Sequence, residues 1–259
     1  LMSTKLYIVE GLPCSGKSST AAHIAQITGG ELFDEGCGDH PADYEFSAFI
    51  PDGVDFSVKK LSEEYAQRIP GGVILPLNKL SGEDFDRALK YKIYDGLDWE
   101  TERPVMLDKW RGFAANAGDT VYVFNCVILQ NPMCETMMRF NLQPEESLEY
   151  ITEICNIIAP LDPTVIYLKC TDISAQIRSA LPERGTEWLN AVVDYHCNGG
   201  YGTANGLSGF DGYISALKER QKRELDFLPC LPVKSVILED AQLDWSHSYR
   251  KIDEILANK

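Results

Sequence analysis

Residues 11–18 read Gly-Leu-Pro-Cys-Ser-Gly-Lys-Ser and satisfy every position of the pattern G-x-x-x-x-G-K-[ST]. They follow a short apolar run, Leu6-Tyr7-Ile8-Val9, and open a segment, 17–28, whose apolar residues have helical spacing. A glycine-rich turn between a strand and a helix gathers backbone N–H groups and the positive end of the helix dipole around one small volume. Phosphate oxygens accept many hydrogen bonds at once, so the stretch predicts a phosphate-binding loop.

The context of this loop makes an accidental match improbable. With glycine at about 7% of residues, the pattern arises by chance in roughly one chain in a hundred of this length. Lys17 is expected to bridge the β- and γ-phosphates of ATP, standing in solvent until ATP binds, and the Ser18 hydroxyl is expected to bind Mg²⁺. The predicted nucleotide-binding residues are Gly11, Leu12, Pro13, Cys14, Ser15, Gly16, Lys17, Ser18 and Ser19.

Strand and helix patterns alternate along the chain, which is typical of a parallel sheet covered on both faces. The unbroken apolar run YVFNCVIL at 122–129 is the strongest strand pattern and suits a central strand. Turn-forming glycines follow the helix at 17–28 and the short strand at 31–35. The remaining predicted strands are 164–168 and 233–238, and the last predicted helix is 246–256.

Two segments exceed what such a sheet needs. Residues 36–103 form a long insertion, in which Val58, Leu61, Tyr65 and Ile69 predict one helical face and Ser81 with Asp84 predicts the start of another helix. Residues 198–212 are so rich in glycine that we expect a mobile loop there rather than a packed element.

Residues 104–117 allow two interpretations. PVMLD resembles an apolar strand that ends in a metal-binding Asp, but Leu107, Trp110 and Ala114 recur at helical spacing and Pro104 suits a first helical turn. We favour the helix, which leaves Asp108 on a helix surface without a catalytic role.

The composition excludes several classes of partner. Lys and Arg number 24 against 39 Asp and Glu, a formal charge of −15, which repels nucleic acid. No apolar run reaches the roughly 18 residues of a membrane span, and the first eleven residues lack a signal-peptide pattern. The eight cysteines are scattered without a CxxC pair, which favours free thiols. These features predict a cytoplasmic protein with a small-molecule partner.

The segment EGLPCSGKSSTAAHIA, residues 10–25, resembles the first strand–loop–helix unit of the P-loop kinases, the superfamily of nucleotide kinases, deoxynucleoside kinases and small antibiotic phosphotransferases. The resemblance implies one α/β domain over 1–259, with a five-stranded parallel sheet in the order 2-3-1-4-5 flanked by helices. It also implies that 36–103 lies on the acceptor side and that 172–212 forms a lid over ATP.

The same resemblance suggests catalytic and substrate-binding residues outside the loop. Deoxynucleoside kinases place a carboxylate at the end of the second strand, the place of Asp34 and Glu35 here. Lid arginines neutralise the transferring phosphate, the expected role of Arg178 and Arg184. The expected acceptor-binding residues are Asp39, His40, Gln130 and Asn131. The last two replace the usual acidic or DR-type sequence after the third strand, so a second Mg²⁺-supporting residue stays unassigned.

Three functions remain open from the sequence. An ATP- and Mg²⁺-dependent kinase acting on a small molecule, such as a nucleoside or nucleotide, is favoured by the loop and the long insertion. A regulatory GTPase would need a guanine-reading NKxD, and Asn78-Lys79-Leu80-Ser81 lacks the Asp. A P-loop NTPase or nucleotide-binding protein without kinase activity is the alternative that the absent DR sequence keeps open.

Overall fold

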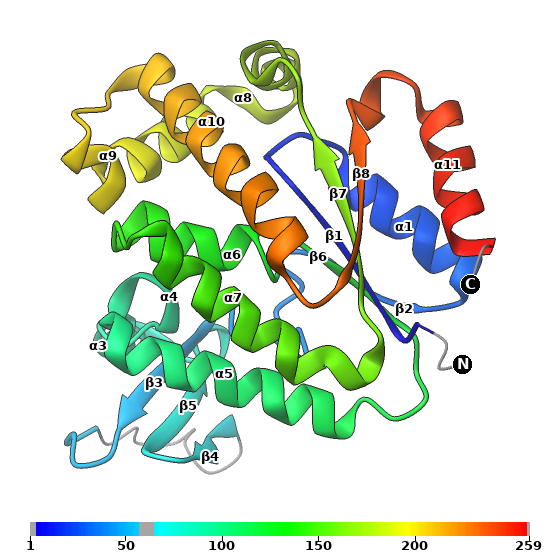
Figure 1. The fold of residues 1–259 in the computed structure, drawn as a ribbon. Helices are drawn as coiled ribbons and strands as arrows, with labels where there is room; N and C mark the ends of the chain where they lie inside the picture. The colour runs from blue at the N-terminus through cyan, green and yellow to red at the C-terminus, as the bar shows by residue number, and fades with distance from the viewer. Residues whose placement is uncertain (1–3, 57–64, 258–259) are drawn as a thin grey trace. The chain divides into compact units, whose positions relative to one another are not determined.

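The structure of the chain, a computed structural model, describes residues 4–56 and 65–257 (Figure 1). It divides into two compact units. One, here called the sheet unit, joins Leu1–Glu35 to Ala114–Lys259; the other, the insertion unit, is Gly36–Phe113 and contains the insertion expected at 36–103. No helix in the described ranges has the length and apolar composition needed to cross a membrane.

The sheet unit is built on a parallel five-stranded sheet in the order β2-β6-β1-β7-β8. Counted along this sheet's own strands, the order is 2-3-1-4-5, as the resemblance implies. β1 pairs with β6 through Leu6↔Tyr122 and with β7 through Tyr7↔Thr164. The strands are β1 (Leu6–Gly11), β2 (Glu31–Phe33), β6 (Tyr122–Asn125), β7 (Thr164–Lys169) and β8 (Lys234–Glu239).

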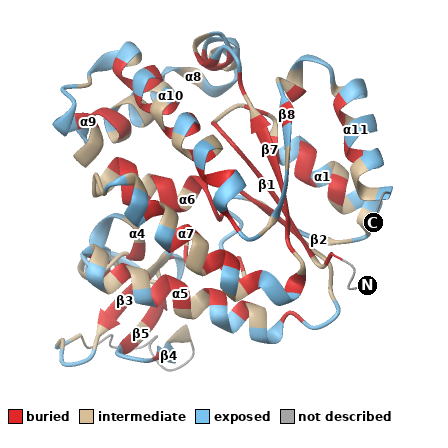
Figure 2. Cartoon of the chain, in the orientation of Figure 1, coloured by how far each residue is buried: buried red, intermediate tan, exposed pale blue. Residues whose placement is uncertain are grey.

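Helices cover both faces of this sheet, and β1 is buried along its whole length (Figure 2). α1 (Lys17–Thr28) and α11 (Trp245–Ala257) pack on the face that carries Val9, with Ile24 and Ile252 in the same apolar cluster. The alternate side chains of the strands point the other way. On that face, Tyr167 of β7 donates to Glu224 of α10 (Gly209–Phe227).

β6 ends at Asn125, four residues before the predicted end of the strand at 129. Cys126 has a φ of +56°, a left-handed conformation that stops a strand. The Glu10 carboxylate accepts from the amides of Ile128 (2.7 Å), Leu129 (3.0 Å) and Gln130 (3.0 Å). These amides therefore satisfy a buried side chain rather than a strand ladder. The chain continues through α6 (Gln130–Met133), a π-helical turn (Cys134–Arg139), α7 (Pro144–Ile158) and α8 (Ile173–Asn198).

The expectation of an unpacked loop at 198–212 is wrong, because α9 (Gly200–Ala204) and the start of α10 occupy it. Its glycines permit close contacts between backbones. A Cβ on Gly199 would lie 2.5 Å from the carbonyl oxygen of Met138, and one on Gly202 would clash with that of His196. Close packing therefore accounts for Gly199 and Gly202, whereas Gly206 and Gly209 have open space around them and positive φ values.

The insertion unit contains an antiparallel three-stranded sheet, β3-β5-β4, which the sequence analysis did not predict. The favoured helix at 104–117 corresponds to α5 (Trp99–Asn116), with Pro104 inside it and Asp108 half-buried. Of the helical face expected at 58–69, Val58 and Leu61 lie outside the described residues, and Ile69 is in β4 rather than in a helix. The remaining elements are β3 (Ser47–Pro51), β4 (Gln67–Ile69), β5 (Gly72–Pro76), α3 (Gly82–Leu89) and α4 (Ile93–Gly96).

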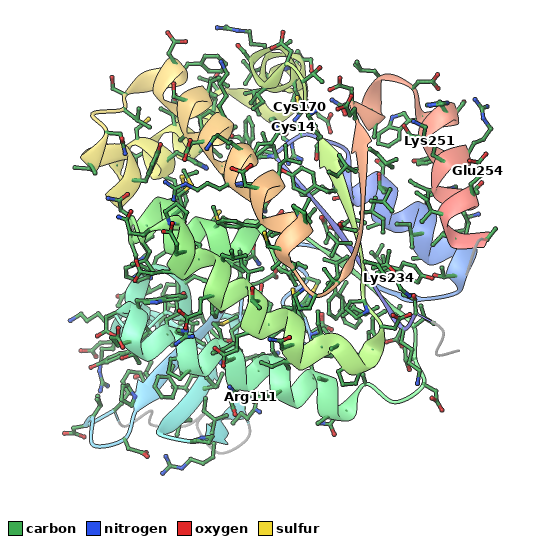
Figure 3. All side chains as sticks on the ribbon, in the orientation of Figure 1. Cys14, Arg111, Cys170, Lys234, Lys251 and Glu254 are labelled. Carbon is green, nitrogen blue, oxygen red and sulfur yellow. The ribbon has the colours of Figure 1, made fainter. Side chains whose placement is uncertain are left out.

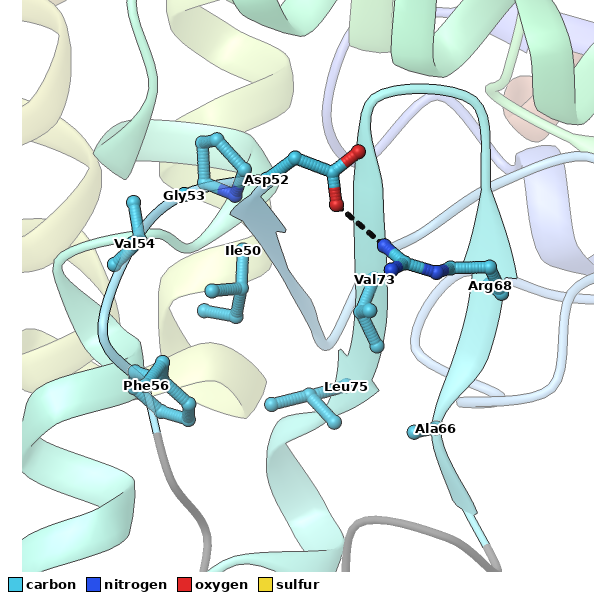
Figure 4. A pocket seen from close by; sticks show the side chains of 10 residues that line it. Ile50, Asp52, Gly53, Val54, Phe56, Ala66, Arg68, Val73 and Leu75 are labelled. Atoms are coloured by element: carbon cyan, nitrogen blue, oxygen red, sulfur yellow. Dashed lines mark hydrogen bonds and ion pairs between the residues drawn. The ribbon is translucent and has the colours of Figure 1, made fainter.

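A pocket of about 310 Å³ opens on the small sheet of the insertion unit (Figure 4). Its wall is mixed, with the apolar side chains of Ile50, Phe56 and Leu75 beside charged ones. Arg68 and Asp52 form an exposed ion pair at the pocket, 2.5 Å from Nη1 to Oδ1. Such exposed pairs contribute little to stability. None of the residues expected to bind substrate lines this pocket.

Candidate functional site

The predicted phosphate-binding loop connects β1 to α1 and depends on both of its glycines. Gly11 and Gly16 have φ values of +146° and +91°, which side chains disfavour. A Cβ on Gly11 would lie 2.7 Å from the carbonyl oxygen of Leu168, and one on Gly16 would lie 2.9 Å from Cζ2 of Trp245. Gly16 is also the N-cap of α1, so the exposed amides of the first helical turn begin at the loop. This geometry suits an anion.

Of two buried polar side chains in the loop, Lys17 has a hydrogen-bond partner and Ser15 has none. Lys17 is only 8% exposed, and its Nζ donates to the carbonyl oxygen of Leu12 at 3.0 Å. The expectation that Lys17 stands in solvent is therefore wrong. Ser15 is buried, and its Oγ has no hydrogen-bond partner in the structure. A buried hydroxyl without a partner favours a site that receives one from a ligand.

Ser18, Asp34 and Asn125 converge at the carboxyl end of the sheet. Ser18 Oγ donates to Asp34 Oδ1 at 3.2 Å, and Asn125 Nδ2 donates to Ser18 Oγ at 3.1 Å and to the same Asp34 oxygen. They come from α1, from the residue after β2 and from the last residue of β6. Asn125 Oδ1 is buried without a partner. These oxygen atoms are of the kind that Mg²⁺ prefers, so the residues fit the expected ion.

Glu35 has a separate set of neighbours. Gln130 Nε2 donates to Glu35 Oε1 at 3.1 Å. Burial raises the pKa of the Cys126 thiol well above its usual value; Lys17 opposes this rise, and Glu35 adds to it. The two adjacent carboxylates thus face different partners, Asp34 toward Ser18 and Glu35 toward Gln130. Asn131 belongs to α6, where its backbone N–H donates to Cys126.

The two expected lid arginines lie on α8 and are exposed. The guanidinium of Arg184 is near Cys14 of the loop: burial raises the pKa of the Cys14 thiol, and Arg184 acts to lower it. Arg178 instead stacks on the ring of Phe210, 4.2 Å from its centroid. Cys14 packs against the apolar cluster of Cys170, Ile173 and Tyr213 (Figure 3). Only Arg184 is thereby brought to the loop.

The expected acceptor residues Asp39 and His40 belong to the insertion unit. Asp39 is exposed, whereas His40 is buried and its Nδ1 accepts from the amide of Ala42 at 3.1 Å. Burial, with Lys109 nearby, lowers the pKa of His40 to about 4, so the ring is neutral at physiological pH. A neutral buried imidazole can hydrogen-bond but cannot supply charge.

Sequence reasoning missed three residues that contact the loop or Asp34: Asn125, Gln176 and Trp245. Asn125 could have been identified, because it is the one amide side chain within the apolar run YVFNCVIL. Gln176 and Trp245 are separated from the loop by more than 150 residues, and no local pattern distinguishes them.

No protein-family model matches the sequence, and no curated protein is significantly similar to it. Among solved structures, the chain is similar to deoxyadenosine kinase from M. mycoides with bound dATP, at 15% identity and a TM-score of 0.47, over 97% of this chain and 99% of that one. It is also similar to thymidylate kinase from Candida albicans, at 12% identity and a TM-score of 0.43, over 99% and 92% of the two chains. A third is the YorR protein of Bacillus subtilis in complex with phosphorylated GDP, at 12% identity and a TM-score of 0.45, over 97% and 95%. With its strand order and its loop, the chain has a P-loop kinase-like fold.

Proposed function

We propose that the protein is an ATP-dependent kinase that transfers a phosphoryl group to a hydroxyl of a small molecule, with nucleosides and nucleotides as the first acceptors to test. The observation that carries the proposal is the cluster of Ser18, Asp34 and Asn125 beside the loop. A phosphate cradle next to a set of oxygen ligands is the combination that phosphoryl transfer needs. The absence of a disulfide at any of the eight cysteines, all within the described residues, suits a cytoplasmic protein.

Each residue of the site has a proposed task. The loop amides and Lys17 hold the polyphosphate, with Lys17 exchanging the Leu12 carbonyl for phosphate oxygens. Ser18, Asp34 and Asn125 would hold Mg²⁺, which neutralises charge on the phosphates when bound. Glu35, oriented by Gln130, accepts the proton of the acceptor hydroxyl. Arg184 stabilises charge on the transferring group from the lid side.

Fewer contacts support the assignment of the acceptor-binding residues than support that of the nucleotide-binding residues. In this proposal the insertion, 36–103, supplies the acceptor pocket, with Asp39 and the neutral His40 as hydrogen-bonding residues, and 172–212 acts as the lid. Gln130 is better assigned to orienting Glu35 than to direct acceptor binding, since it already donates to that carboxylate.

A transfer assay separates the functions. Wild-type protein, Lys17→Ala and Glu35→Gln are incubated with Mg²⁺, ATP labelled at the γ-phosphate and a panel of nucleosides and nucleotides. We expect acceptor labelling by the wild type, a loss of about 10² to 10⁴-fold in Glu35→Gln with ATP binding retained, and loss of both binding and transfer in Lys17→Ala. Because Lys17 is buried and bonded to Leu12, thermal melting must show that the alanine variant is folded.

One observation favours the alternative of nucleotide binding without transfer. Asn125 ends the third strand of the sheet where a carboxylate would bind the metal more strongly, and its amide carries no charge. Under this alternative, wild-type protein binds ATP but labels no acceptor. Release of labelled phosphate with no acceptor present would instead identify an ATPase.

A further inference from the structure

Arg220 of α10 is a buried cation that the proposed mechanism does not use. It is 1% exposed, and its Nε lies 2.9 Å from Oε1 of Glu224, one turn further along the helix. Glu224 is fully buried and accepts from the Tyr167 hydroxyl at 2.6 Å. Burial alone would lower the pKa of Arg220, but the nearby Glu224 raises it overall, so the guanidinium stays charged.

The far end of this guanidinium reaches the phosphate-binding loop. Arg220 Nη2 donates to the carbonyl oxygen of Gly11 at 3.2 Å, and Nη1 lies 3.9 Å from Sγ of Cys134. Gly11 is the first residue of the loop and the last of β1. One side chain therefore joins α10 to the point where the strand turns into the loop.

Three successive carbonyl groups at the start of the loop accept from side chains. Gly11 accepts from Arg220, Leu12 from Lys17 at 3.0 Å and Pro13 from Gln176 at 2.8 Å. Fixing the carbonyls of Gly11 and Pro13 fixes the planes of their peptide groups, and with them the directions of the N–H groups of Leu12 and Cys14. The Leu12 carbonyl precedes Pro13, which has no N–H. Lys17 must leave Leu12 to reach a phosphate, so two of the three contacts remain when nucleotide is bound.

We propose that Arg220 is a positioning residue for polyphosphate binding, holding the Gly11 carbonyl so that the amides of the loop converge on the phosphates. A buried ion pair can usually be replaced by apolar residues with little loss of stability. The bond to Gly11 is what an apolar replacement cannot supply. The proposal rests on the proposed function only in taking a nucleoside triphosphate as the ligand of the loop.

The test compares two charge pairs on the same helix. Arg220→Met with Glu224→Leu removes the pair that reaches the loop. The matched control is Arg223→Met with Glu219→Leu, which removes a pair of the same spacing, with Nε and Oε1 also 2.9 Å apart. Calorimetry with Mg²⁺ and ATP measures affinity, and melting without nucleotide measures stability.

We expect the ATP affinity of the Arg220 pair variant to be at least tenfold weaker than that of the wild type, with a higher KM for ATP. The ATP affinity of the control variant should be unchanged. If Arg220 had only a structural role, the Arg220 pair variant would melt at a different temperature, but the folded variant would bind ATP as tightly as the wild type. If the first variant does not fold, Arg220→Lys keeps a charge beside Glu224 but cannot also reach Gly11, and should bind ATP more weakly at nearly normal stability. Wild-type affinity in either folded variant overturns the proposal, whereas no ATP binding by the wild type overturns the proposed function instead.

Discussion

Trp245, the first residue of α11, packs its six-membered ring against Gly16 at the start of α1. A Cβ placed on Gly16 would lie 2.9 Å from Trp245 Cζ2, closer than real Cβ contacts come, and the φ of +91° disfavours any side chain. The ring of Trp245 thus brings α11 into contact with the phosphate-binding loop at Gly16. Gly16 is required both for its conformation and for the space it leaves.

Gly16→Ala should weaken ATP binding at least tenfold, because the added methyl group must displace either the loop or the Trp245 ring. Adding Trp245→Ala should recover part of the affinity by relieving the clash while leaving the strain. Gly29→Ala is the matched control: Gly29 caps the same helix at φ +67° with nothing near its Cβ position. It should lower stability without affecting ATP affinity. Equal ATP affinities for Gly16→Ala and wild type, by calorimetry, would contradict the prediction.

Asn125→Asp should strengthen Mg²⁺ binding, because it adds a carboxylate beside Ser18 and Asp34. Asp34→Asn should weaken it by about 10 to 100-fold, the effect typical of losing a ligand or its support. The measurement is the Mg²⁺ concentration that gives half-maximal nucleotide binding at fixed ATP.

The double variant is the control for this pair of changes. Asp34→Asn with Asn125→Asp moves the carboxylate without changing the net charge and should restore most of the Mg²⁺ affinity. If neither single change alters the Mg²⁺ requirement, the ion is held elsewhere.

The predictable part of the fold was the part with local patterns. The strand–loop–helix unit, the five parallel strands and α5 follow from apolar spacing and turn residues that lie close together in the sequence. β6 was predicted too long because Val127, Ile128 and Leu129 are as apolar as a strand. The amides of Ile128 and Leu129 instead donate to the buried Glu10 carboxylate, more than a hundred residues away, which no local pattern reveals.

The residues of the candidate site likewise fall into those that a local sequence pattern identifies and those that it does not. The loop residues were identifiable because eight consecutive positions match one pattern, and Asp34 and Glu35 because a strand ends beside them. The contacts of Gln176 and Arg220 to loop carbonyls depend on how α8 and α10 pack. The segment 198–212 was predicted to lack a packed element because glycine serves both flexible loops and close backbone contacts.

Glu10→Gln should make the sheet unit more sensitive to acid. Burial raises the pKa of Glu10 to about 7 from an ordinary 4.5, so the folded state binds this proton more tightly and Glu10 adds stability as the pH falls from 6.5 to 4.5. Burial lowers the pKa of His196 to about 4 from 6.5, so His196 lowers the stability of the fold as the pH falls over the same range. Within the sheet unit the two effects oppose each other.

Without the Glu10 contribution, the effect of His196 remains. Two pH units correspond to about 3 kcal/mol, so the unfolding free energy of Glu10→Gln should fall by about that much more than that of the wild type between pH 6.5 and 4.5. Urea unfolding at several pH values measures the difference. His196→Gln, the matched control, should show the reverse, with an unfolding free energy that falls less toward acid than that of the wild type. Parallel pH profiles for wild type and Glu10→Gln would rule out the buried proton.

Nucleotide should protect the middle of α8 from hydrogen exchange more than it protects the glycine-rich segment that follows. The 178–188 segment contains Pro182 and Gly185, whose φ of +83° interrupts the helix, and a Cβ on Gly185 would touch nothing within 4 Å. The helix is therefore interrupted within this segment, and Arg184 within it lies near the loop.

The segment 199–202 is already held by backbone contacts with the π-helical turn and with α8, so ATP has little left to order there. Mass spectrometry with and without a non-hydrolysable ATP analogue and Mg²⁺ should show slower exchange at 178–188, little change at 199–202 and none in α7. Lys17→Ala, which should not bind the analogue, must abolish the effect. Protection confined to 199–202 would mean that the lid closes through the glycine-rich segment. Unchanged exchange at both 178–188 and 199–202 would mean that neither segment closes over nucleotide.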